Sequence, residues 1–186
     1  MKRLCSRSFA GILLGLMLAW MSACASEPRL VDHAFSFDAR RSSPDAEVLN
    51  YRYGDSNTPG ARVQAYSLRD GKIPQAASIN GAFPRGDTLY VKWRIKTTGE
   101  IFEDTVDLKS RLPDDITGNR IYFIIDGPQM YVYLISLDFI RGYLTQEEVA
   151  VADREMTTPH KKALRSYIRN KIITIYPDQL KTQETK

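Results

Sequence analysis

The segment from residue 120 to residue 137 constrains the fold most, because its two predicted strands are apolar or aromatic on both faces. Gly127-Pro128 separates Arg120–Asp126 from Gln129–Leu137, and glycine permits the positive φ of a tight turn. A hairpin centred there has these opposed pairs: Ile121 with Leu134, Tyr122 with Tyr133, Phe123 with Val132, Ile124 with Tyr131, and Ile125 with Met130. Such strands lie centrally in a sheet. We expect their cover to be the C-terminal helix, a second sheet or a partner protein.

A second hairpin is predicted from residue 88 to residue 108. The strands Thr88–Lys96 and Glu100–Leu108 flank Thr98-Gly99, and we place those two residues at the tip. This register gives the following pairs: Ile95 with Phe102, Val91 with Val106, Leu89 with Leu108, Arg94 with Glu103, Lys92 with Thr105, and Tyr90 with Asp107. Trp93 then lies opposite Asp104, which indicates an edge position or a carboxylate that the indole satisfies.

Weaker signals come before these hairpins. Period-two alternation indicates early strands at Val31–Ala39 and Glu47–Tyr53. Two stretches rich in glycine, proline and small polar residues, Gly54–Arg62 and Asp70–Asp87, are predicted to be irregular loops.

The last third of the chain is predicted to be helical first and extended last. A capping box at Thr145–Glu148 starts a helix that ends near Glu155. Its expected buried stripe is Val149, Ala152 and Met156. Thr158-Pro159 starts another helix through Tyr167, and the strand Lys171–Tyr176 closes the chain. We therefore expect a mainly β, α+β fold: an antiparallel sheet or sandwich built from hairpins, with one or two short C-terminal helices.

The N-terminus has the three-part order of a secretory signal. Three cationic residues precede the apolar run Phe9–Trp20, and Met21-Ser22-Ala23 lead into Cys24. The run has 12 residues, fewer than the roughly 20 that a membrane-spanning helix needs. We therefore interpret residues 1–23 as a signal peptide that is removed and takes no part in the fold.

Cys24 follows the predicted cut and is a candidate lipidation site, because a thiolate can attack a diacylglyceryl donor. Met21–Cys24 resembles a bacterial lipobox, with Met21 where leucine is usual. The alternative is an ordinary secretory signal cut after Ala23 or Ala25. Acyl chains on Cys24 would anchor residues 24–31 as a tether on the periplasmic side of a bilayer. Ala25, where an aspartate would favour inner-membrane retention, indicates outer-membrane sorting.

Charge and cysteine content exclude two further possibilities. Cys5 lies in the removed segment, so no disulfide framework is possible. Residues 1–23 hold three positive charges and no negative ones, so their removal lowers the net charge from +4 to +1. That balance lacks the basic excess of nucleic acid binding. With no internal repeat or linker, residues 32–178 are expected to form one globular domain, followed by a flexible tail, 179–186.

Residues suited to catalysis or metal binding are sparse. After the predicted cut the only histidines are His33 and His160, and neither lies in a nucleophile or metal motif. We interpret both as surface or strand histidines. Glu103, Asp104 and Asp107 alternate between strand faces, which favours cross-strand pairing over a metal site. The sequence therefore predicts a protein that is not an enzyme and uses no cofactor or metal.

Aromatic and basic side chains gather on the two hairpins. Tyr90, Lys92 and Arg94 lie on the first, and Tyr131 and Tyr133 on the second. Tyrosine and arginine are enriched at protein interfaces, so these five residues are our candidate partner-binding residues. The alternative is that the tyrosines pack under the C-terminal helix.

Several segments resemble a family of small proteobacterial lipoproteins. They are LYVKWR at 89–94, EDTVDL at 103–108, IYFI at 121–124 with Gly127-Pro128-Gln129, and the stretch 172–178. Some members of that family are similar to periplasmic immunity proteins of type VI secretion phospholipase effectors. The resemblance spans residues 32–178. It implies a common fold and a protein partner, with no catalytic residues to carry over.

Three functions remain as hypotheses. The first is a lipid-anchored periplasmic protein that acts by protein binding, as an immunity protein that occludes the active site of a type VI secretion phospholipase effector. The second is a structural or assembly lipoprotein of the cell envelope or of a secretion machine. The third is an unrecognised enzyme, whose best catalytic candidates would be His33, His160 and Asp104.

Overall fold

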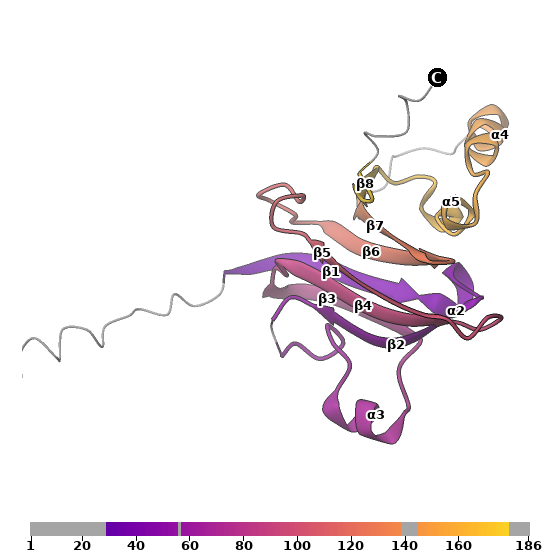
Figure 1. Cartoon of the computed structure of the whole chain (residues 1–186). Helices are drawn as coiled ribbons and strands as arrows, with labels where there is room; N and C mark the ends of the chain where they lie inside the picture. Colours follow the sequence, from indigo (N-terminus) through magenta and orange to yellow (C-terminus); the bar gives the residue numbers. More distant parts are fainter. Residues whose placement is uncertain (1–28, 56, 139–144, 179–186) are drawn as a thin grey trace, which may run out of the picture.

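Two β-sheets and several short helices make up the described part of the chain (Figure 1). The computed structural model describes residues 29–55, 57–138 and 145–178. The predicted signal peptide, Cys24, most of the tether and the tail 179–186 lie outside these residues. The first strand, β1, begins at Leu30, so the last two residues of the predicted tether belong to a sheet.

The larger sheet has five strands and the smaller has three. In spatial order, the larger sheet contains β3 (Ala76–Pro84), β1 (Leu30–Asp38), β6 (Asn119–Asp126), β7 (Gln129–Ser136) and β8 (Ile172–Tyr176). The smaller contains β2 (Ala46–Tyr53), β4 (Thr88–Ile95) and β5 (Ile101–Asp107). All neighbours run antiparallel except β1 and β6, which are parallel. The expected mainly β, α+β fold class is confirmed.

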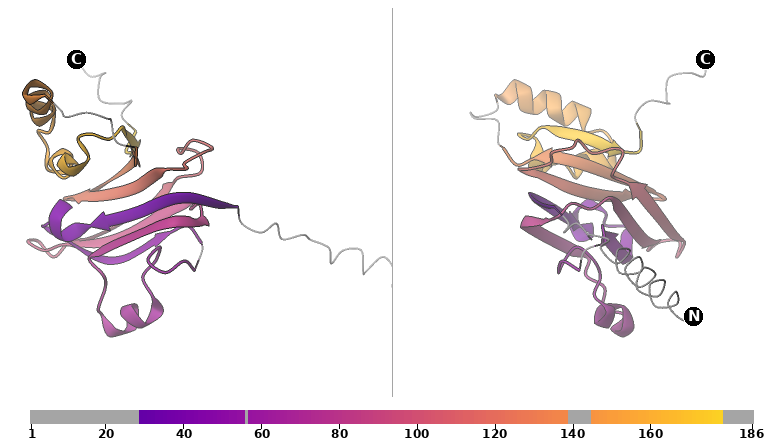
Figure 2. Two further views of the ribbon diagram at one scale, coloured as in Figure 1. Left: turned by 180° about the vertical axis from the view of Figure 1, so that it is seen from behind. Right: turned by 90° about the vertical axis from the view of Figure 1, so that its left-hand side faces the viewer.

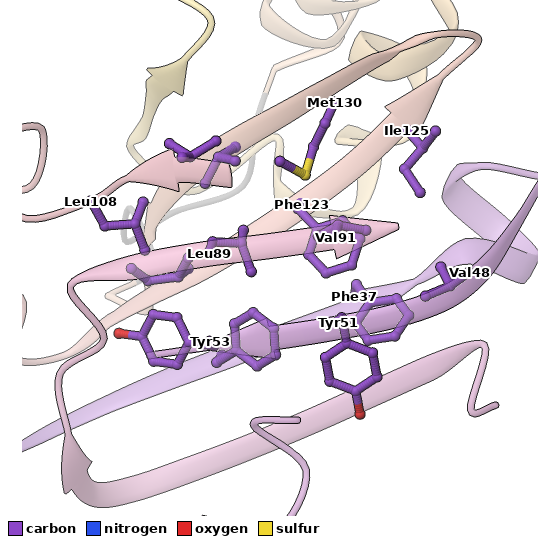
Figure 3. Close-up of a cluster of buried hydrophobic side chains, with 14 of the residues drawn as sticks. Phe37, Val48, Tyr51, Tyr53, Leu89, Val91, Leu108, Phe123, Ile125 and Met130 are labelled. Atoms are coloured by element: carbon purple, nitrogen blue, oxygen red, sulfur yellow. The ribbon is translucent and has the colours of Figure 1, made fainter. Parts of the chain in front are cut away.

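One aromatic core joins the two sheets (Figure 3). Phe35 of β1 stacks on Tyr53 of β2 with ring centroids 4.8 Å apart, and Phe37 stacks on Phe123 of β6 at 4.5 Å. Aromatic pairs of this kind contribute about 0.5–1.5 kcal/mol beyond the area that they bury. The indole N–H of Trp93 also donates a hydrogen bond to the carbonyl of Gly127 at 3.0 Å. This bond joins strand β4 to the β6–β7 turn.

The hairpin β6–β7 has the register that the sequence predicts, pair for pair from Ile121–Leu134 to Ile125–Met130. Its two strands lie inside the five-stranded sheet and are covered on both faces. The smaller sheet covers one face. Residues of the C-terminal segment, among them Leu164 and Tyr167, cover the other, where Tyr122, Ile124, Tyr133 and Ile135 are buried.

The predicted register of the hairpin β4–β5 is wrong by two residues. Trp93 lies opposite Phe102, and Lys92 lies opposite Glu103. The turn is longer than expected: Ile95 exchanges backbone hydrogen bonds with Gly99 and Glu100 at 2.8 Å, and Gly99 has φ 77°. A slip of two residues leaves every side chain on its own face, so alternation could not distinguish the two registers.

The expectation of an irregular segment at Asp70–Asp87 is also wrong. Residues Ala76–Pro84 form the edge strand β3, which pairs with β1 along its whole length. Phe83 is its only buried residue. Gly81 and Pro84 are tolerated because an edge strand leaves one row of backbone groups unpaired. A short helix, α3 (Ala65–Asp70), precedes it.

The C-terminal helices lie on the side of the five-stranded sheet that faces away from the smaller sheet (Figure 2). The capping box of α4 (Gln146–Glu155) is confirmed, with Thr145 and Glu148 bonded reciprocally. Its expected buried stripe is only half-buried. The second predicted helix is split into α5 (Pro159–Lys162) and the 3₁₀ turn η2 (Arg165–Tyr167).

Candidate interaction surfaces

The five candidate partner-binding residues lie on two faces that point in opposite directions. Tyr90, Lys92 and Arg94 alternate with the buried residues of β4, so they lie on the outer face of the three-stranded sheet. Tyr131 and Tyr133 alternate with Met130, Val132 and Leu134 of the core, so they lie on the outer face of the five-stranded sheet. The fold therefore divides them between two surfaces. Cys24 lies outside the described residues.

Charged side chains form cross-strand pairs on the outer face of the three-stranded sheet, which we call the ladder face. The Lys92 ammonium lies 3.4 Å from a Glu103 carboxylate oxygen, and the Tyr90 hydroxyl donates to that oxygen at 2.9 Å. Across the other strand, Arg94 donates to Glu47 at 3.4 Å. These hydrogen bonds, first from Tyr90 and then from Lys92, hold the pKa of Glu103 below its usual value. Exposed ion pairs add little to folding stability, so exchanging the partners of these charges would cost the fold little free energy.

The ladder face also offers apolar contact and a hollow. Ile101, opposite Arg94 in β5, is 52% exposed. Beside it, Arg94 and Glu47 line a hollow of about 670 Å³, which Leu68 and Lys72 from the segment around α3 close on the other side. An aromatic ring, both signs of charge, an exposed aliphatic residue and a concavity therefore occur together. Of these features, the tyrosine and the arginine are of the residue types enriched where proteins bind one another.

Tyr131 and Tyr133 contact their own chain. The Tyr131 ring stacks on His160 of α5 with centroids 3.7 Å apart and planes 11° apart. Tyr133 is buried, and burial raises the pKa of its hydroxyl. Tyr131 and Tyr133 therefore pack under C-terminal elements, as the alternative interpretation of the sequence expected.

His160 is buried rather than exposed, which corrects the expectation of a surface histidine. Its Nδ1 lies 3.2 Å from an Asp126 carboxylate oxygen, and its Nε2 lies 3.1 Å from the Thr158 hydroxyl. The order hydroxyl, imidazole, carboxylate is that of a hydrolytic triad. Thr158, however, is not among the residues that line the adjoining hollow. The contacts fasten α5 to the β6–β7 turn.

His33 is also buried, although it lies on a strand as expected. Its Nδ1 lies 2.8 Å from the carbonyl oxygen of Val31, which can only accept, so this nitrogen has the proton of the neutral ring. Nε2 then accepts from the Tyr53 hydroxyl at 2.9 Å. Burial lowers the pKa of His33 and raises the pKa of Tyr53 to about 12. Both groups are neutral at pH 7, and the His33 ring stacks on Phe83.

Sequence reasoning missed a second cluster of polar residues, on the outer face of the five-stranded sheet. Basic side chains from α2 (Ala39–Ser42), β6 and the C-terminal segment surround a hollow there. Among the described residues, no group of three or more potential ligands is arranged for a metal ion. No helix in the same residues has the length and apolar character to cross a bilayer.

Comparison with known proteins gives no relative. No family model, curated protein or solved structure matches the chain.

Proposed function

We propose that this protein is a lipid-anchored envelope protein that acts by binding another protein through the ladder face. The observation that carries the proposal is the grouping of Tyr90, Lys92 and Arg94 on a face that remains exposed, with Ile101 and a hollow beside them. The outer face of the five-stranded sheet is instead occupied over β6 and β7 by the C-terminal segment.

The chemistry of the ladder face suits a protein partner that presents charges of both signs. Lys92 and Arg94 each lie 3.4 Å from a carboxylate oxygen. A partner can replace one member of a pair without leaving an unpaired buried charge, because both members come from flexible, exposed side chains. Tyr90 adds a ring with a polar end, which gives contact area at low entropic cost.

The proposed anchor would keep the whole domain near a membrane. β1 begins at Leu30, six residues after Cys24. A chain of that length spans at most about 20 Å. With the outer-membrane sorting that Ala25 indicates, the proposed site of action is the periplasmic surface of the outer membrane, where a partner that attacks or assembles on lipid acts.

The narrower form of the proposal is that the partner is a phospholipase effector of type VI secretion, which this protein inhibits as an immunity protein. It rests on the sequence resemblance, together with the short tether that would hold the domain near the lipid substrate of such an effector. Occlusion by contact requires no catalytic residue in this chain.

Co-expression with a candidate effector in the periplasm tests both forms. We expect the wild-type protein to protect cells and Arg94→Glu to lose protection. The substitution replaces the cation with a carboxylate that lies beside the carboxylate of Glu47. Lys161→Glu, an exposed change on α5, is the matched control and should protect.

Crosslinking in native membranes separates the two forms when protection fails. Capture of one envelope protein by the wild type and Lys161→Glu, but not by Arg94→Glu, supports binding through the ladder face and identifies an assembly role in place of immunity. Equal capture by all three proteins contradicts the ladder face as the binding surface.

A further inference from the structure

The hollow on the outer face of the five-stranded sheet lies over its small residues. β1 and β3 present Ser36, Ala76 and Ser78 there, and the C-terminal segment packs over β6 and β7 beside them. Because the strands present no large side chain at this place, a hollow of about 610 Å³ remains between α2 and η2. We call it the basic hollow. Its size is that of a small-molecule site.

Cations dominate the lining of the basic hollow. Five basic residues line it, together with a single carboxylate: Arg40, Arg41, Arg120, Lys162 and Arg165, with Asp38. Asp38 pairs with Arg40 at 3.0 Å and reaches Arg41 at 3.9 Å. On the ladder face Lys92 and Arg94 each pair with a carboxylate of their own, whereas here five cations accompany one carboxylate. Such an excess in a concave place attracts anions.

Two buried polar atoms in the lining have no hydrogen-bond partner among the described residues. Ser36 is 5% exposed, and its Oγ is one of them. The other is Nε of Arg120, whose Nη1 donates to the Tyr167 hydroxyl at 2.9 Å. The guanidinium is thus held in place by one nitrogen while a second donor remains unused. Buried polar groups are normally paired, so these two atoms indicate a ligand that accepts from them.

We propose that the basic hollow binds a small organic anion that bears a phosphate group. A phosphate accepts charge-assisted hydrogen bonds from arginine in a planar, bidentate fashion and also accepts from a serine hydroxyl. The volume exceeds that of one phosphate ion, so the ligand includes an organic part that contacts Tyr122 and Tyr167. A soluble phosphate ester and the headgroup of an anionic phospholipid have this chemistry in common.

The test follows the backbone amide of Ser36 and the Nε–H of Arg120 by NMR in the mature protein, held in phosphatidylcholine nanodiscs. Glycerol 3-phosphate is the soluble probe, and glycerol at the same concentration is the uncharged control. We expect saturable shifts of both signals with glycerol 3-phosphate and none with glycerol. A second sample uses nanodiscs that contain phosphatidylglycerol, with no glycerol 3-phosphate added. The same shifts in this sample assign the ligand to a phospholipid headgroup.

Three substitutions locate the site. Arg41→Gln and Ser36→Ala should each weaken binding, the arginine by about tenfold because one charge-assisted interaction is lost. Ser36→Ala removes only a hydroxyl from the strand, so this variant should fold as the wild type does and any loss of binding reports on the site itself. Arg69→Gln, which removes the same charge from α3 outside the hollow, should bind as the wild type does. An equal loss in Arg69→Gln, or the absence of shifts in both samples, overturns the proposal.

Discussion

The two outer faces of the molecule use similar side chains in different ways. Tyr90, Lys92 and Arg94 of the ladder face bond to carboxylates on neighbouring strands and stay in contact with solvent. Tyr131 and Tyr133 alternate in the same manner along β7 but are covered by the segment from His160 onward. A strand tyrosine stabilises the fold where a distant part of the chain packs over it, and it is available to a partner where nothing does. The residue type is the same in both cases.

Truncation of one tyrosine on each face is the strongest way to break this comparison. Tyr133→Ala should lower the free energy of unfolding by about 3 kcal/mol, because it leaves a cavity under the C-terminal segment. Tyr90→Ala should change it by less than about 1 kcal/mol, since the ring is only half-buried on the outer face and its loss leaves no enclosed cavity. Urea unfolding followed by circular dichroism measures both. Similar losses in the two variants would contradict the assignment of an open and a covered face.

The contacts of His160 offer a smaller, local test of the same cover. His160→Ala removes the stack on Tyr131 and the hydrogen bond to Asp126. The helix α5 is too short to persist alone. We expect amide hydrogen exchange across residues 159–167 to rise by about tenfold, equivalent to the loss of one charge-assisted contact. Lys161→Ala, its exposed neighbour, is the control, and unchanged exchange in His160→Ala would show that other contacts hold the segment.

The smallest effect expected is a pH dependence that separates the core from the ladder face. The pKa of His33 in the folded protein lies below its ordinary value of 6.5, so the unfolded chain binds the proton more tightly. The stability that this difference contributes is complete above pH 6.5 and is lost as the pH falls toward the folded pKa. The pKa of Glu103 is also lowered, but from 4.5, so its contribution is lost only below that pH.

Unfolding midpoints measured from pH 7.5 to pH 5 check this order. His33→Leu should flatten the profile between pH 6.5 and pH 5, although it also removes the bond to Tyr53 and lowers the plateau. Glu103→Gln should leave that part of the profile unchanged. A flat profile in the wild-type protein would contradict a depressed pKa at His33.

The accuracy of the two hairpin predictions differed for a physical reason. Gly127-Pro128 forms a two-residue turn, and its length sets the register of β6–β7 without ambiguity. The β4–β5 turn contains Lys96-Thr97-Thr98-Gly99, whose residues suit either of two turn lengths. Both lengths keep the same faces, so only packing, with Trp93 over Phe102, selects the observed register.

A candidate site could be predicted from the sequence where all its residues lie on a single strand. Alternation along β4 places Tyr90, Lys92 and Arg94 on one face whatever the turn length. The basic hollow was not predictable, because its cations come from segments that are far apart in the sequence and are brought together by β1–β6 pairing and by the return of η2. Nor was β3, since an edge strand with one buried residue has no apolar alternation to detect.

The sequence by itself determined the mainly β class, the central hairpin and its register, and the cap of α4, because each depends on neighbouring residues. The tertiary structure decided which strand faces are covered, the burial of His33 and His160, and the gathering of arginines around the hollow. Those properties depend on contacts between residues distant in the sequence, whose free energy is gained only when the two sheets and the C-terminal segment pack together.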